Sequence, residues 1–192
     1  MITTMILATF LAYLILCPKY LQTASGGGNQ SKLSKLKDEI RQVKPFESVR
    51  AEAYVGLQRT ADLVSRPVEK VFSRWKLTTE QYNVLRIQRG AEPEGLPTLE
   101  IGRRMITRAS NVTRIIDRLE IKAYVVRRRE TQDRRVVRIR ISDSGLKLLT
   151  DMDEDVVVAT ATALGGVTDA EAKTLNGILE KLREGVQDFH RR

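Results

Sequence analysis

The stretch DRRVVRIRISDSG, from Asp133 to Gly145, decides the fold of this 192-residue chain. After its first four residues, apolar side chains alternate with arginines, the period-2 pattern of a half-buried β-strand. Ser142, which follows the strand, is typical of a helix N-cap. The stretch therefore predicts a β-hairpin with a basic tip, then a strand with two faces and a new helix. One face would turn toward a core and the other outward: Val137, Ile139 and Ile141 against Arg138 and Arg140.

Two helices are expected just before this hairpin. Thr98 opens a short helix with Leu99, Ile101 and Met105 as its apolar contacts. After a tight turn, Thr107 is placed to cap a second helix from Arg108 to about Ile121. On that helix one apolar stripe recurs at helical spacing, at Val112, Ile115, Ile116 and Leu119. A helix pair followed by a basic hairpin is the winged helix-turn-helix pattern.

Positive charge is concentrated in the same part of the chain. Residues 98–141 hold thirteen Lys and Arg against five Asp and Glu, a surplus of eight, whereas the whole chain has a net charge of +9. Phosphate contacts dominate affinity for nucleic acids, so a basic patch confined to this module favours DNA as a partner. The alternative is a charged, solvated surface without a nucleic-acid partner.

The face of the second helix opposite its apolar stripe carries the groups suited to reading DNA. In the major groove arginine pairs with guanine and asparagine with adenine, so Asn111 and Arg114 are the expected base-reading residues. Asp117 shares this face and would repel phosphate. The full expected set on this helix is Arg108, Ser110, Asn111, Thr113, Arg114 and Arg118.

The hairpin tip is expected to reach the minor groove. Arg134 and Arg135 stand at the turn, and the negative potential of a narrow minor groove attracts arginine. Asp133 would pin a neighbouring arginine or the turn backbone. In the strand before the tip, residues 127–129 are all arginine and can expose only alternate side chains, so phosphate contact is expected for some of them.

Composition argues against an enzyme and against a metal site. The chain has one cysteine, Cys17, and one histidine, His190, too few for a four-ligand Cys/His zinc site or an intrachain disulfide. A Ser-His-Asp triad would depend on His190 near the C-terminal end. The glycines at 26–28 lack the pattern of a phosphate-binding loop and indicate a linker. We expect no catalytic residues, no metal and no cofactor.

Residues 1–16, MITTMILATFLAYLIL, contain no charged residue. Three interpretations stay open: an assigned start upstream of the true one or a dispensable extension, a membrane anchor, and a secretory signal. As a helix the segment would span about 24 Å, short of the roughly 30 Å hydrocarbon core, and it lacks the basic n-region of a signal. Since a linker at 24–30 follows it, residues 1–30 are expected to be dispensable for folding and DNA binding.

Further helices are predicted on both sides of residues 98–141, the helix pair and hairpin that we call the reader. Before it, Leu33, Leu36, Ile40 and Val43 recur at helical spacing, and Pro67 is expected to kink or divide a long helix from Phe46 to Lys76. Capping boxes open two helices, at Thr78 with Gln81 and, for the last helix, at Thr168 with Glu171. Long helices outside a reader favour dimerisation, with a monomeric bundle as the alternative. The expected domains are an apolar segment with linker (1–30), N-terminal dimerisation helices (31–77), a winged helix-turn-helix (78–141) and C-terminal dimerisation helices (142–192).

From Leu77 to Gly145 the chain resembles transcriptional regulators of the MarR family. LTTEQYNVLRI is similar to the family's helix before the reader, LEIGRRM to its first reader helix and NVTRIIDRLE to its recognition helix. DRRVVRIRISDSG is similar to the D-x-R wing, and its motif falls on Asp133 and Arg135. The chain departs from the family at residues 122–124, Lys-Ala-Tyr where members commonly have Lys-Gly-Leu, and in its apolar N-terminus.

The resemblance implies a mainly α fold with a small β-wing, in which a winged helix-turn-helix is flanked by dimerisation helices. It also implies a homodimer that binds a pseudo-palindromic DNA operator and releases it when a small, often phenolic, effector binds. Thiol sensing is not expected, because Cys17 lies in the apolar run rather than in the folded domain.

We therefore expect a cytoplasmic, sequence-specific DNA-binding repressor or activator. It would read the major groove with helix 108–121 and the minor groove with the wing at 130–136. Two other hypotheses stay open. A winged helix can serve as a protein-binding module, since fold does not fix function, and the regulator would be membrane-tethered if residues 1–16 are retained.

Replacing Arg135 with alanine is expected to weaken binding to most duplex sequences, because a minor-groove contact senses width and potential more than base identity. The expected loss is about 1–3 kcal/mol. Fluorescence anisotropy titrations with several unrelated duplexes at moderate salt would measure it. Unchanged affinity for all of them would remove Arg135 from the interface.

Overall fold

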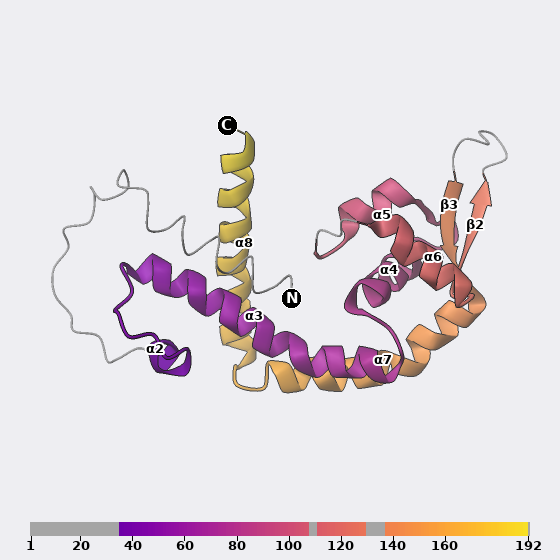
Figure 1. Ribbon diagram of the computed structural model, residues 1–192. Helices are drawn as coiled ribbons and strands as arrows, with labels where there is room; N and C mark the ends of the chain where they lie inside the picture. The colour runs from indigo at the N-terminus through magenta and orange to yellow at the C-terminus, as the bar shows by residue number, and fades with distance from the viewer. Residues whose placement is uncertain (1–34, 108–110, 130–136, 192) are drawn as a thin grey trace. The chain divides into compact units, whose positions relative to one another are not determined.

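The computed structural model describes residues 35–107, 111–129 and 137–191, the last five by their backbone alone (Figure 1). The chain divides into two compact units between Glu47 and Ser48. The described part of the first unit contains one short helix, α2 (Lys35–Glu39). Apolar spacing predicted a helix reaching Val43, but the chain turns at Arg41, whose φ of 54° lies in the left-handed region.

The second unit holds the remaining helices and a three-stranded antiparallel sheet of order β1-β3-β2. β2 and β3 form the predicted hairpin, with Val125 opposite Ile141 and Arg129 opposite Val137. β1 was not predicted, because two residues that include a proline carry no strand periodicity. In chain order the elements are α3 (Val49–Arg74), α4 (Thr79–Arg89), β1 (Leu96–Pro97), α5 (Thr98–Arg104), α6 (Val112–Ile121), β2 (Val125–Arg129), β3 (Val137–Ile141), α7 (Asp143–Ala163) and α8 (Asp169–Arg191).

The helix α3 runs without a break through Pro67, so the predicted division of this helix is wrong. Proline inside a helix removes one hydrogen bond and costs about 3 kcal/mol. The turn after Pro67 buries Val71 and Phe72 in the core, and α3 lies side by side with α7 (Figure 1). Burying two large apolar side chains offsets a penalty of that size.

One hydrophobic core joins the reader helices, the sheet and the first half of α7. The predicted inward face of β3 is confirmed, with Ile139 fully buried and Ile141 nearly so. Leu99 was expected inside but is 69% exposed, because Ile101 and Met105 occupy the inner side of the short helix α5. The fully buried side chains of largest volume include Leu85, Ile101, Ile116, Leu119, Ile139, Leu149 and Met152.

Three predicted helix starts are confirmed in detail. Thr78 and Gln81 form a reciprocal capping box at α4, and the hydroxyl of Ser142 accepts the backbone N–H of Gly145 at the start of α7. At α8 the carboxylate of Glu171 accepts the backbone N–H of Thr168 at 2.8 Å. This hydrogen bond lowers the pKa of Glu171 below its ordinary value. Short polar residues thus mark where the chain enters each helix.

The apolar side chains along α8 are exposed within the single chain. Leu175, Ile178 and Leu182 are each between 41% and 52% exposed, although they fall on one face of the helix. Within the described residues no helix has the length and apolar character needed to cross a bilayer.

The recognition helix α6 ends in a turn that usually requires glycine. Ala123 has a φ of 58°. Its N–H bonds to the carbonyl of Glu120 at 2.8 Å, and the N–H of Tyr124 bonds to the carbonyl of Leu119 at 2.9 Å. This pair of hydrogen bonds is the Schellman motif. The family's glycine is absent, as the sequence indicated, but the left-handed geometry is retained by an alanine.

Replacing Ala123 with glycine is expected to stabilise the fold by about 0.5–1 kcal/mol, because glycine relieves the left-handed strain and this gain exceeds its extra entropy loss. Urea denaturation followed by circular dichroism measures the change. Ala161, exposed inside α7, is the matched control, and glycine there should destabilise the protein by about 1 kcal/mol. A loss of stability at position 123 would contradict the interpretation.

Candidate nucleic-acid interface

The recognition helix begins later than predicted. Its N-cap is Asn111, whose side-chain oxygen accepts the backbone N–H of Arg114 at 3.0 Å, and the helix starts at Val112. The expectation that Thr107 caps a helix starting at Arg108 is therefore wrong. Asparagine caps a helix at least as well as threonine, so the sequence offered two candidates and no means of choosing. Arg108 and Ser110 lie outside the described residues.

The predicted division of α6 into two faces is confirmed. Ile116 and Leu119 are fully buried, and Val112 and Ile115 pack partly against the same core. Four of the predicted site residues, Asn111, Thr113, Arg114 and Arg118, are exposed. Burial of the apolar stripe therefore leaves these side chains available to a partner.

Arg127 on β2 pairs with both acidic residues of α6. Its guanidinium donates to the carboxylate of Asp117 at 2.5 Å and to that of Glu120. The hydrogen bond to Asp117 contributes most to raising the pKa of Arg127 above its ordinary value, and partial burial opposes it. Asp117 was expected to repel phosphate from the reading face. In the structure Asp117 is paired with Arg127, which offsets part of this repulsion.

The exposed arginines of α6 have no partner within the described residues. Arg114 and Arg118 lie one turn apart, and neither guanidinium has a hydrogen bond or ion pair there. By contrast, Arg104 at the end of α5 binds Glu100 at 2.8 Å, and this contact lowers the pKa of Glu100. Cations left unpaired on one exposed helix face are suited to an external anion such as phosphate, or to a guanine edge.

The turn that precedes α6 is tied to α4. The side-chain oxygen of Asn83 accepts the backbone N–H of Ile106 at 2.9 Å. The helix α4 thereby fixes the chain a few residues before the recognition helix begins. Sequence reasoning missed this role for Asn83, since no local pattern links it to a residue 23 positions away.

The structure describes the base of the wing, formed by β2 and β3, but not its tip at residues 130–136. Arg128 and Arg129 are exposed on β2. The predicted tip residues Asp133, Arg134 and Arg135 lie outside the described residues, so their roles stay predictions.

Arg138 and Arg140 were expected to face outward, but each is only partly exposed. The strand β1 pairs with one edge of β3, with Leu96 opposite Ile139, and brings Gly95 next to both arginines. Arg138 donates to the carbonyl of Gly95 at 3.2 Å. The Nε of Arg140 is buried, and no hydrogen-bond partner for it occurs among the described residues. The contacts with Gly95, just before the unpredicted strand β1, make these two arginines less available than expected.

Residues 77–137 match the model of the MarR family. The uncharacterized HTH-type transcriptional regulator YpoP of Bacillus subtilis (strain 168) is 32% identical over 111 residues, which cover 56% of this chain and 74% of YpoP. The crystal structure of a MarR transcription factor from Planctomyces limnophilus is 40% identical, with a TM-score of 0.56, and the match covers 71% of this chain and 98% of that one.

A third similar protein has been solved on DNA. Sco3205 of Streptomyces coelicolor, described as a MarR family transcriptional regulator in complex with DNA, has a TM-score of 0.65 at 21% identity. The match covers 72% of this chain and 92% of that chain. At 21% identity this similarity shows a shared fold and nothing more.

Replacing Arg127 with glutamine is expected to weaken duplex binding about tenfold at low salt, because it leaves the two carboxylates of α6 unpaired near the phosphates. Electrophoretic mobility shifts across a salt series would measure the loss. Adding Asp117→Asn to the Arg127→Gln variant should recover part of the affinity by removing one of the two charges. Equal binding by wild type and Arg127→Gln would show that these carboxylates do not face DNA.

Proposed function

The chain belongs to the MarR family of DNA-binding transcriptional regulators, and we propose that it acts as a homodimer reading a pseudo-palindromic operator. In each protomer α6 would enter the major groove and the hairpin tip the minor groove. The observation that carries this proposal is the charge arrangement on α6. Both of its carboxylates are held by Arg127, while Arg114 and Arg118 have no partner within the described residues.

Base reading is assigned to the two residues at the start of this face. Arg114 presents a guanidinium without a partner among the described residues, and this group can pair with guanine through two hydrogen bonds. Asn111 uses its oxygen to cap the helix, and its amide NH₂ group stays available to donate. Thr113 and Arg118 would contact bases or phosphates on either side. A winged helix that binds only protein is not favoured, since such a function gives no reason for this charge pattern.

Dimerisation is supported by apolar side chains that the single chain leaves exposed. On α8 the side chains of Leu175, Ile178 and Leu182 fall on one face, and on α3 Tyr54 and Leu57 are 50% and 43% exposed. Exposed apolar surface of this kind is typical of an interface between subunits. A two-fold dimer would place its two recognition helices about one turn of DNA apart.

The effector is assigned to the groove between α3 and α7. The groove has a volume of about 1120 Å³, with Val71, Val158 and Ala159 among its apolar walls and Lys70 on its rim. An aromatic ring would pack against the apolar walls. An ionised phenol or carboxylate would be attracted to Lys70, against the opposing charge of Glu69, Glu154 and Asp155 in the same groove. The site would couple effector binding to DNA release, because both helices that line it also pack against the reader.

A catalytic role is not proposed, since the relatives are transcriptional regulators rather than enzymes. The place of action would be the cytoplasm, where the chromosome is accessible. The operator, once selected from random duplex DNA, should be nearly symmetric.

The test of base reading compares Arg114→Ala with Arg66→Ala. Arg66 pairs with Asp62 on α3, so its replacement removes the same charge far from the reading face. Arg114→Ala should lower the discrimination between the selected operator and random DNA by roughly 1–3 kcal/mol per lost base contact, and Arg66→Ala should not. An equal loss of affinity for the operator and for random DNA would show that Arg114 contacts phosphate and does not read a base.

Asn111 requires a different design, because alanine would also remove the helix cap at a cost of about 1 kcal/mol. Asn111→Ser keeps a capping oxygen and loses the amide. If Asn111 reads a base, this variant should melt like the wild type and lose discrimination at one operator position. Retained discrimination would leave Asn111 with the capping role alone.

A further inference from the structure

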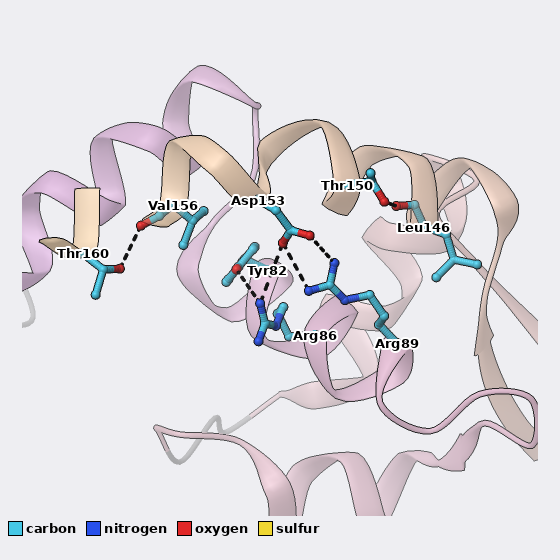
Figure 2. Close-up of polar contacts among 8 residues, drawn as sticks. All are labelled: Tyr82, Arg86, Arg89, Leu146, Thr150, Asp153, Val156 and Thr160. Atoms are coloured by element: carbon cyan, nitrogen blue, oxygen red, sulfur yellow. Dashed lines mark hydrogen bonds and ion pairs between the residues drawn. The ribbon is translucent and has the colours of Figure 1, made fainter. Parts of the chain in front are cut away.

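Two carboxylates on α7 reach to different helices. Asp153 receives Arg89 of α4 through two hydrogen bonds, from Nη1 to Oδ2 at 2.7 Å and from Nη2 to Oδ1 at 3.1 Å (Figure 2). Asp155 accepts the indole N–H of Trp75 at 3.0 Å, just beyond α3, and lies 3.5 Å from Arg74. Residues two apart on a helix point about 200° apart. Polar contacts on both sides of α7 therefore hold it to α3 and to α4.

The pair between Arg89 and Asp153 is suited to fixing an orientation. A guanidinium bound through two parallel hydrogen bonds holds the carboxylate in one plane, which a single contact cannot do. The side chains of Arg89 and Asp153 are 29% and 41% exposed, so the pair contributes little to overall stability. Arg86 adds a weaker contact to the same carboxylate at 3.8 Å. The contribution of this cluster is therefore geometric more than energetic.

The helix α4 is held at both of its ends. Near its start the ring of Tyr82 stacks on Phe72 of α3, with ring centroids 4.2 Å apart. Near its end Arg89 binds Asp153 on α7. Seven residues separate the two points, about 10 Å along the helix axis. Because α4 also packs against α7 through the shared core, release of the second point would allow only a small rotation of α4 and of the helices α5 and α6 packed on it.

We propose that Arg89 and Asp153 are a positioning pair that sets the angle between the reader and α7, and thereby the operator spacing that the dimer accepts. This inference rests on the proposed homodimeric function. Successive base pairs are separated by about 3.4 Å, so a small rotation of each reader changes the preferred spacing. The pair touches no DNA, and its loss should affect spacing rather than base recognition.

The experiment uses the full-length protein and the duplex that the wild type selects from random DNA. Affinities are measured for this duplex, for the same duplex with one base pair inserted or removed at its centre, and for an isolated half-site. The main variant is Asp153→Asn. Its matched control is Asp151→Asn, which removes the same charge from α7 but breaks only a pair with Lys147 on that helix.

Asp153→Asn should lower the ratio of affinities for the native and the altered spacing at least about threefold. This magnitude corresponds to the loss of one partly exposed ion pair in each protomer. Affinity for the half-site should stay unchanged, and Asp151→Asn should behave like the wild type. Arg89→Lys should show the same direction, because lysine keeps the charge but cannot form the paired hydrogen bonds. This second variant provides the comparison if Asp153→Asn does not fold, as judged by circular dichroism.

Two contrary outcomes are distinguishable. If the wild type prefers one spacing, and Asp153→Asn or Arg89→Lys keeps that preference, the positioning role is wrong and the proposed function stands. If the wild type selects no duplex, or binds an isolated half-site as tightly as the full operator, the proposed dimeric function fails and the inference fails with it.

Discussion

Packing of the apolar face of α6 against the core is the constraint on which the interface depends. Ile116 and Leu119 are fully buried, together with Ile139 of the wing strand and Leu85 of α4. Removing either side chain of α6 would cost several kcal/mol, so the helix has one stable rotation about its axis. That rotation exposes Arg114 and Arg118 and brings Asp117 and Glu120 to Arg127. Recognition chemistry in this protein is thus a consequence of core packing.

Local patterns in the sequence predicted the elements whose information is local. The alternation in β3, the apolar stripe of α6 and the capping residues of α4, α7 and α8 each depend on neighbours within a few positions. The start of α6 was predicted wrongly, because Thr107 and Asn111 both have the chemistry of an N-cap. Only the tertiary structure decides between two such residues.

The features that sequence analysis missed depend on contacts between distant residues. The strand β1 is two residues long and is defined by its pairing with β3, and this pairing brings Gly95 against Arg138 and Arg140. In the sequence Arg127 is one of three consecutive arginines. In the described structure it is the one that forms ion pairs with α6. A signal for this role did exist, since Asp117 and Glu120 are three apart and so share one side of their helix. Without the path of the wing strand, the arginine that meets them could not be named.

Asn111 serves as the cap of α6 and as one of its proposed base-reading residues, which limits how operator preference can change over evolution. A substitution there must keep a short side chain with an accepting oxygen, or the recognition helix loses its first turn. The accessible alternatives are serine, threonine and aspartate, and none has an amide NH₂ group that can donate to a base while the side-chain oxygen caps the helix. New operator preferences would therefore arise through substitutions at Thr113, Arg114 and Arg118, while the capping role constrains position 111.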